Sequence, residues 1–261
     1  MNKPSLDSLG IDLLHTSVWE RVSCLMLPIV TAAGFFWAGN RGWWWLALLC
    51  AILQSFFTYA SVSHDLVHRT LRLPRWLNEL LLTAIEGLNF RSGHAFRVTH
   101  LHHHQSFPSA DDLEGAAARM SWWRALLDGV TAQPRLGWWA LRHSRGANRA
   151  WIVVEAIVVI AFASACLFSP VGRVYLIVIV AGSWIFPMMT SFMPHDVSGS
   201  DPLHQTRLFR GRLIAWLSFE HLYHLEHHLY PQVPHQRWPE LARRLDPYFA
   251  AEGIQPIILW R

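Results

Sequence analysis

Charge is scarce in this chain of 261 residues: Asp, Glu, Lys and Arg make up 15%, whereas 52% of the residues are apolar. That is too little charge for an ordinary soluble surface, and the composition also excludes a disordered chain and a coiled coil. Cysteine is scarce too, and Cys24, Cys50 and Cys166 all lie within apolar stretches. This placement excludes a disulfide framework and a cysteine-based zinc site. A polytopic membrane protein is therefore the first class to test.

Four long stretches are almost free of charge: 22–39, 43–62, 151–168 and 174–193. The hydrocarbon core of a bilayer is about 30 Å thick and needs roughly 20 helical residues to cross it. The only charged residue in these stretches is Glu155, which we expect near the lipid headgroups because it lies close to the start of the third. The connections 40–42 and 169–173 are short, so each pair of stretches should form a tight hairpin. The first 21 residues lack an apolar core, so we expect no cleavable signal peptide.

We predict a single all-α membrane domain over residues 1–261, with four transmembrane helices arranged as two hairpins, 22–62 and 151–193. Arg41 and Arg173 are the only basic residues at the hairpin tips. By the positive-inside rule, both termini and the segment between the hairpins are then cytoplasmic, and they form a helical cap on the hairpins.

Three segments make up this cap: 1–21, 63–150 and 194–261. In the middle one we expect a re-entrant or interfacial helix at 77–90 and surface-lying amphipathic helices at 120–142. We expect a multi-pass protein of a bacterial inner membrane. Its basic charge then reports orientation, and no nucleic-acid partner is expected.

Histidine is unusually abundant, with 16 residues, and none lies inside the four apolar stretches as drawn. Most follow the cytoplasmic ends of those stretches in three sets with helical spacing, which places the imidazoles of a set on one helix face. The sets are His64 and His68; His100, His103 and His104; and His224, His227 and His228. Neutral imidazole binds transition metals, and eight imidazoles are too many for one ion. We interpret them as ligands of two metal ions that keep open coordination positions.

Other residues have less certain roles. His195 follows the fourth stretch as His64 follows the second, and we predict that it is a ninth ligand. His221 is either a ligand or a hydrogen-bond donor to one. His94 is also a candidate ligand, but for His94 and for His102, which both project away from the ligand face, we favour a supporting role or none. We expect His15, His143, His204 and His235 to be surface residues.

Carboxylates flank the histidine sets, and each either accepts a hydrogen bond from a ligand imidazole or pairs with a nearby arginine. They are Asp65, Asp111, Asp112, Asp196, Glu220 and Glu226. Of these, Asp65, Asp196 and Glu226 are also candidates for the metal site itself. Direct ligation is the weaker interpretation, because the Glu-x-x-His pattern of carboxylate-bridged di-iron bundles is absent at helical spacing.

The three histidine sets resemble the signature of the membrane fatty acid desaturase and hydroxylase superfamily, which includes carotenoid ketolases. The segment His227-His228-Leu229-Tyr230-Pro231-Gln232-Val233-Pro234 is also similar to its usual continuation after the third set. The resemblance covers most of the chain. It implies four membrane helices, two iron ions bound by the histidine sets, His195 as the additional ligand, and O2 as co-substrate. The substrate is then a lipid or another long apolar molecule in the bilayer.

The resemblance leaves the reaction open. Phe192-Met193-Pro194-His195 and the short chain resemble carotenoid ketolases, but Leu225 stands where their third set has a second histidine. We therefore favour a fatty acid (acyl-lipid) desaturase that introduces a C=C bond, with a carotenoid ketolase or hydroxylase, or another lipid hydroxylase, as the alternative. A metal transporter is the alternative from another class, and a structural or lipid-binding protein would hold no metal.

No His-Pro-Gly-Gly motif of a fused cytochrome b5 is present. Electrons are therefore expected from a separate ferredoxin or cytochrome b5-type donor. The cytoplasmic arginines offer a docking surface for such an acidic carrier.

Overall fold

The computed structural model describes residues 3–211 and 223–259, and it is mostly helical. Its longer helices are α2 (Val18–Asn40), α3 (Trp44–Phe57), α5 (Arg75–Leu88), α6 (Gly93–Ser106), α7 (Trp122–His143), α8 (Gly146–Leu167), α9 (Pro170–Gly182) and α12 (Trp238–Ala251). Shorter helical segments are α1 (Leu6–Leu9), η1 (Ile11–Leu14), η2 (Thr58–Val62), α4 (Ser63–His68), η3 (Glu114–Arg119), η4 (Ser183–Ile185), η5 (Pro187–Phe192), α11 (His224–Leu229) and η7 (His235–Arg237). One parallel pair of two-residue strands joins β1 (Phe209–Arg210) to β2 (Ile257–Ile258). The predominantly helical fold that the sequence predicts is confirmed.

In the described part of the chain, three helical runs are long and apolar enough to cross a membrane: Ile11–Asn40, Gly146–Leu167 and Pro170–Phe192. Their outward side chains are apolar, as the 66% exposure of both Ile160 and Ile177 shows, which suits contact with lipid chains. The predicted second span, 43–62, is divided between the shorter apolar helix α3 and the π-helical segment η2. A fourth span and the two transmembrane hairpins therefore remain predictions.

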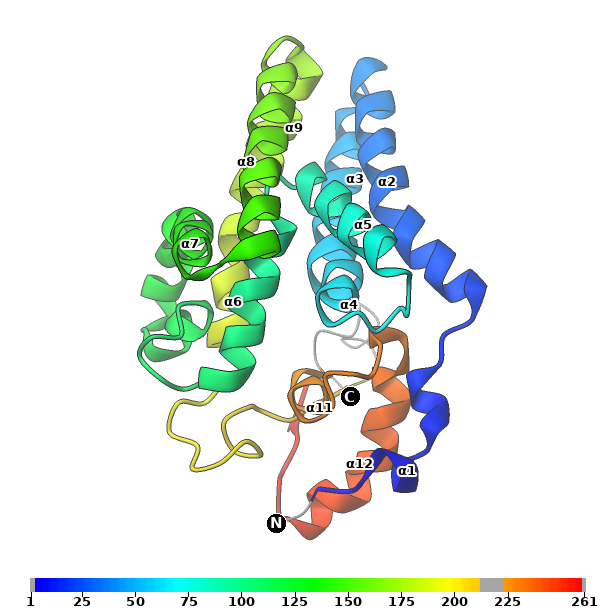
Figure 1. Ribbon diagram of the computed structural model, residues 1–261, viewed down its shortest axis with the longest axis vertical. Coiled ribbons are helices and arrows are strands. Elements are labelled where there is room, and N and C mark those ends of the chain that lie inside the picture. Colours follow the sequence, from blue (N-terminus) through cyan, green and yellow to red (C-terminus); the bar gives the residue numbers. More distant parts are fainter. Residues whose placement is uncertain (1–2, 212–222, 260–261) are drawn as a thin grey trace.

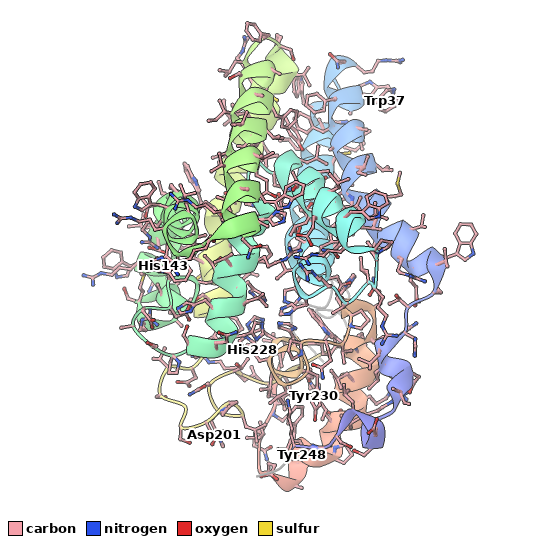
Figure 2. All side chains as sticks on the ribbon, viewed as in Figure 1. Trp37, His143, Asp201, His228, Tyr230 and Tyr248 are labelled. Carbon is pink, nitrogen blue, oxygen red and sulfur yellow. The ribbon has the colours of Figure 1, made fainter. Side chains whose placement is uncertain are left out.

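The apolar helices lie in two neighbouring pairs, α2 with α3 and α8 with α9 (Figure 1). Phe35, Ala51 and Tyr175, from three different helices, share one buried apolar cluster that joins the pairs. The α2–α3 turn depends on Gly42, whose φ of 75° favours glycine. Trp37 lies near this turn, far from His228 in the lower part of the molecule (Figure 2).

The terminal segments pack together at the opposite end of the molecule, where α1, α11 and α12 lie close to one another (Figure 1). Leu13, Leu225, Leu241 and Leu245 are fully buried there in one core cluster. The N-terminal and C-terminal segments thus form one body beyond the ends of the apolar helices, as the predicted cap requires. That this body lies on the cytoplasmic side of the membrane remains a prediction.

The structure gives the bounds of helices in two of the predicted segments. The segment 77–90 lies largely in α5, which buries Leu82 and Ile85 against other protein elements. The segment 120–142 forms one helix, α7, where separate helices were expected. This helix exposes Trp122, Trp138 and other apolar residues on one side.

Glu155, which we predict near the lipid headgroups, has partners inside the protein. Its side chain is only 1% exposed, and its carboxylate accepts hydrogen bonds from His94 Nδ1 at 2.7 Å, Ser92 Oγ at 2.5 Å and Thr83 Oγ1 at 2.6 Å. A charged group in an apolar helix is costly unless it is paired, and here the partners come from α5 and α6 and from the turn between them.

Candidate metal centre

Nine predicted ligands converge from four separate parts of the chain, α4, α6, the turn after η5, and α11. Their ring nitrogens form two groups, and within each group the nitrogens lie within 4.8 Å of one another. Group one is His64, His68, His100, His104 and His227, and group two is His103, His195, His224 and His228. The structure therefore brings together all nine residues that the sequence nominates, and divides them into two sites.

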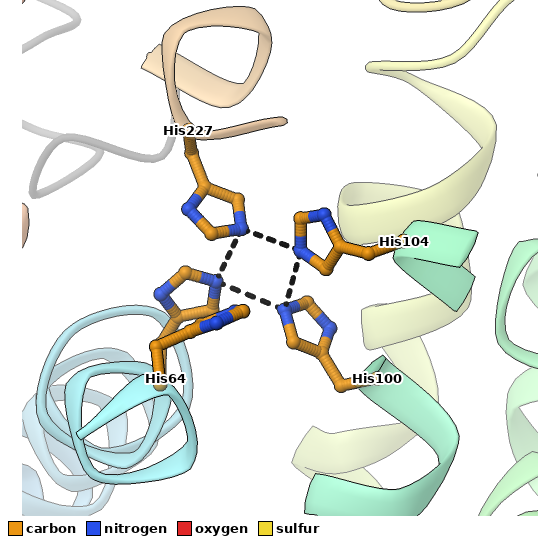
Figure 3. A group of neighbouring side chains, drawn as sticks. His64, His100, His104 and His227 are labelled. Carbon is orange, nitrogen blue, oxygen red and sulfur yellow. Dashed lines mark hydrogen bonds between the residues drawn. The ribbon is translucent and has the colours of Figure 1, made fainter. Parts of the chain in front are cut away.

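In group one, four Nε2 atoms form a ring in which each has two neighbours (Figure 3). The distances are 3.0 Å from His64 to His227, 2.7 Å from His227 to His104, 3.1 Å from His104 to His100 and 3.1 Å from His100 to His64. An imidazole nitrogen has either one hydrogen or one lone pair, so it makes only one good hydrogen bond. Four hydrogen bonds around the ring are therefore impossible.

The same contradiction holds in group two. The Nε2 atom of His195 lies 3.1 Å from that of His103, 3.2 Å from that of His224 and 3.3 Å from that of His228. One nitrogen cannot share a hydrogen with three others. Hydrogen bonding therefore does not account for the close approach of these nitrogens.

A metal ion in each group explains this geometry. Nitrogen ligands about 2.1 Å from an ion and at right angles to each other lie about 3.0 Å apart. His68 Nε2 supports the same conclusion, because it is buried and has no hydrogen-bond partner among the described residues. The residues thus fit two ions, and an all-imidazole donor set suits iron, zinc, copper or nickel.

The protonation states suit metal binding. Burial lowers the pKa of His64, His195, His227 and His228 well below the usual range, and the neighbouring imidazoles lower it further. Burial, together with His100 and Arg97, also lowers the pKa of His68 to about 2. These imidazoles are neutral at physiological pH, so a lone pair is free for a metal ion.

Hydrogen bonds fix the other ring nitrogen of His103, His100 and His195. His103 Nδ1 donates to Asp112 Oδ2 at 2.7 Å, and His100 Nδ1 donates to Glu114 Oε1 at 2.6 Å. His195 Nδ1 donates to the carbonyl oxygen of Ser191 at 3.0 Å. In each case the tautomer leaves the Nε2 lone pair for the metal group. The sequence nominated Asp112 but missed Glu114, whose only signal was its place among the carboxylates after the second histidine set.

Four of the other nominated carboxylates lie in the described part of the chain, and each has a partner outside the two groups. Asp65 binds His235 and Thr70, and Asp196 accepts hydrogen bonds from Ser198. Asp111 is exposed beside His102, and Glu226 pairs with Arg210 at 2.6 Å. His221 and Glu220 lie outside the described residues.

His94 lies outside both groups. Its ring is fully buried between Glu79 Oε2 at 2.6 Å and Glu155 Oε1 at 2.7 Å, and it stacks on Trp151. It therefore joins α5, α6 and α8 in a polar contact, and it supports the centre only through the helices.

The prediction that His235 is a surface residue is wrong, whereas His15, His143 and His204 are exposed as predicted. His235 is buried, and it donates to Asp65 from its backbone N–H at 3.1 Å and from Nδ1 at 2.6 Å. No local pattern could reveal this contact, because its two residues are 170 positions apart. It holds the segment after the third histidine set against α4.

One cavity lies among the apolar helices, and another is lined by grouped histidines. One is apolar, has a volume of about 410 Å³, and lies between α3 and the α9–η5 run, lined by Ile52, Phe56, Phe186 and Met189 among others. Phe56 and Thr190, in its wall, shortly precede His64 and His195 in the chain. The other is more polar, has a volume of about 610 Å³, and is lined by one histidine of each group, His104 and His228.

The chain matches the family described as fatty acid desaturase over residues 41–259. The matched region contains all nine histidines of the two groups. No curated protein matches the chain.

Proposed function

Because the chain belongs to the fatty acid desaturase family, it is a membrane oxidoreductase of the lipid desaturase or hydroxylase type, and we propose that it is a di-iron enzyme that introduces a C=C bond into an alkyl chain. The observation that carries this proposal is the pair of imidazole groups, and the apolar cavity between α3 and the α9–η5 run offers space for an alkyl chain. His64, His68, His100, His104 and His227 would hold one iron, and His103, His195, His224 and His228 the other.

Two irons bound here would supply the oxidising power to remove hydrogen from an unactivated C–H bond, with O2 as oxidant. Desaturation removes two hydrogens from adjacent carbons and, with O2, two electrons and two protons, forms two water molecules. The two electrons must come from outside the chain, and a ferredoxin or a cytochrome b5-type protein is the proposed donor.

The protein's own side chains would position the substrate and exclude water. The apolar cavity accepts an alkyl chain, and Ile52, Phe56 and Phe186 in its wall offer no competing polar partner. Asp112 and Glu114 would hold the Nδ1 hydrogens of His103 and His100, so that both rings keep their Nε2 atoms directed at the irons.

Oxygenation of a carotenoid ring is the alternative. Leu225, which distinguishes the third histidine set from the ketolase pattern, is fully buried in the C-terminal core with Leu241 and Leu245. The difference at position 225 therefore concerns packing and not the ligand set. Cavity size still favours an alkyl chain, because about 410 Å³ is near the lower end of the roughly 300–1,000 Å³ usual for ligand sites.

A metal transporter is disfavoured by the position of the histidines. Transporters bind their ions near the middle of the membrane on interrupted helices. Here all the grouped histidines follow the apolar stretches, in segments where the chain has left them.

The deciding experiment expresses the protein in a host that supplies both ordinary lipids and β-carotene, and analyses fatty acids and pigments together. New unsaturated chains would support the proposal, whereas keto or hydroxy carotenoids would establish the alternative. His68→Ala should abolish the activity, and His143→Ala, which removes an exposed histidine, should not. Iron content far below two per chain after reconstitution would refute the di-iron proposal.

A further inference from the structure

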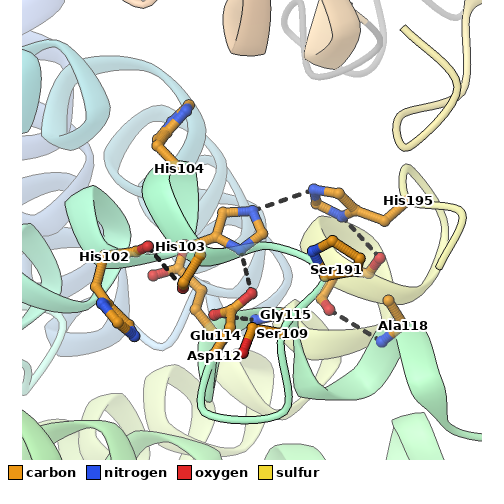
Figure 4. Close-up of polar contacts among 12 residues, drawn as sticks. His102, His103, His104, Ser109, Asp112, Glu114, Gly115, Ala118, Ser191 and His195 are labelled. Atoms are coloured by element: carbon orange, nitrogen blue, oxygen red, sulfur yellow. Dashed lines mark hydrogen bonds and ion pairs between the residues drawn. The ribbon is translucent and has the colours of Figure 1, made fainter. Parts of the chain in front are cut away.

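The segment that follows α6, residues 107–119, folds back along the histidines of that helix (Figure 4). It contains no group-one or group-two histidine. Nevertheless, it contacts ligands of both groups, and it does so through three separate interactions.

The first two interactions come from carboxylates only two positions apart. Glu114 accepts from His100, a group-one residue, and Asp112 accepts from His103, a group-two residue. Asp112 is fully buried, and the side chain of Glu114 is 11% exposed. Hydrogen bonds to charged acceptors inside a protein are stronger than neutral ones, so both should restrict the rotation of the ring.

The third interaction reaches the turn after η5. Ala118 N–H donates to Ser191 Oγ at 3.1 Å, and the carbonyl oxygen of the same serine accepts from His195 Nδ1 (Figure 4). The Phe107 ring also lies 4.5 Å from the ring of His195 and 5.4 Å from that of His103. The segment therefore contacts His100 and His103 directly, and it contacts His195 both through the Phe107 ring and through Ser191.

Hydrogen bonds within residues 107–119 fix the conformation of this segment. Asp112 Oδ1 accepts from the Gly115 N–H at 3.0 Å, so this carboxylate uses one oxygen for its own turn and the other for His103. Arg119 donates to the carbonyl oxygens of Ser109 at 2.8 Å and Asp112 at 2.7 Å. A Cβ atom on Gly115 would lie 2.2 Å from Asp112 Oδ2 and 2.8 Å from the Phe107 ring, so only glycine fits without displacing one of them.

We propose that residues 107–119 are a positioning element shared by the two metal sites, in which Glu114 orients a ligand of one site and Asp112 a ligand of the other. The inference rests on the proposed two-metal function. It adds that each carboxylate affects the metal affinity of its own site. The two sites are nevertheless coupled, because both carboxylates belong to one short segment.

The test measures metal binding, not activity. Metal-free protein in detergent is titrated with Co²⁺, whose visible absorption reports each occupied site. Asp112→Ala and Glu114→Ala should each weaken one of two binding events by about 10–100-fold, the usual cost of removing a hydrogen-bond partner of a ligating histidine. Asp112→Asn and Glu114→Gln keep an oxygen acceptor and should recover part of the loss.

A second ligand variant identifies the affected site. In a His224→Ala background, which disables group two, Glu114→Ala should weaken the remaining ion and Asp112→Ala should not. Gly115→Ala leaves both carboxylates in the chain, but it should weaken the group-two ion because it displaces Asp112. Combined with Asp112→Ala, it should add little further effect on that ion.

Asp111→Asn is the matched control, because Asp111 lies in the same segment, is 67% exposed, and contacts no grouped histidine. Equal weakening by Asp111→Asn, or Co²⁺ affinities of the alanine variants within twofold of the wild type, would overturn the inference. Wild-type protein that binds fewer than two ions would instead refute the proposed function.

Discussion

Replacing His235 with alanine should destabilise the protein markedly, although the histidine lies outside both metal groups. Its Nδ1 donates to Asp65 Oδ2 at 2.6 Å, and the side chain of Asp65 is only 1% exposed. The variant removes a hydrogen bond to a buried carboxylate, worth about 1.5–3 kcal/mol, and leaves Oδ2 without that partner. For a chain of this size each 1 kcal/mol lowers Tm by about 2–4 °C, so a fall of roughly 3–12 °C is expected.

The measurement is a thermal unfolding scan of the metal-free protein in detergent, made at one scan rate for all variants because unfolding of membrane proteins is often irreversible. His235→Asn keeps an N–H donor near the position of Nδ1 and should recover part of the loss. His143→Ala is the control, since its exposed ring bonds only the carbonyl oxygen of Trp139 on its own helix. A Tm of His235→Ala within 1 °C of the wild type would show that the contact with Asp65 contributes little.

Three further predictions concern packing, the cavity and pH. Gly129→Ala should lower Tm, because a Cβ atom there would lie 1.7 Å from the Trp184 carbonyl oxygen. Gly137→Ala is the control on the same helix: its Cβ atom would meet nothing within 4 Å, so the variant should be neutral or stabilised by up to about 1 kcal/mol. Equal Tm values for the two variants would contradict this prediction. Gly182→Leu should fill the apolar cavity and shift activity toward shorter alkyl chains. Unchanged iron content is the control for folding. An unchanged product profile would show that alkyl chains bind elsewhere. Metal-free protein should lose stability as the pH falls below about 6.5, because buried imidazoles such as that of His68, whose pKa is lowered to about 2, take up protons only on unfolding. Equal unfolding midpoints at pH 7.5 and pH 5.5 would refute that linkage.

Local spacing was enough to nominate the metal ligands. A helix repeats every 3.6 residues, so His64 with His68, and His224 with His227 and His228, had to share faces wherever their helices packed. The parallel between His195 and His64, each following an apolar stretch, predicted the ninth member. All nine residues lie in the two groups that the structure forms.

The division of the ligands could not be read from spacing. His100, His103 and His104 were predicted as one set, but His103 joins group two while His100 and His104 join group one. The third set divides as well, because His227 belongs to group one and His224 and His228 to group two. Which ring meets which depends on the angle and distance between α6 and α11, and neither helix encodes these alone.

The partners of buried polar side chains were the feature of the structure that the sequence predicted least well. Glu155 looked like an interfacial charge and His235 like a surface histidine, yet each is buried against a residue far away in the chain, His94 and Asp65 respectively. A carboxylate that pairs with a distant histidine has the same sequence appearance as one that faces water.

The sequence by itself determined that the protein is apolar, helical and rich in histidines placed just beyond its apolar stretches, because composition and helical periodicity are local properties of the chain. The tertiary structure alone decided that these histidines form two groups, that one short segment after α6 contacts members of both, and that an apolar cavity lies between α3 and the α9–η5 run. Those features arise where helices from distant parts of the chain meet, and the free energy of such contacts depends on packing geometry that no local pattern contains.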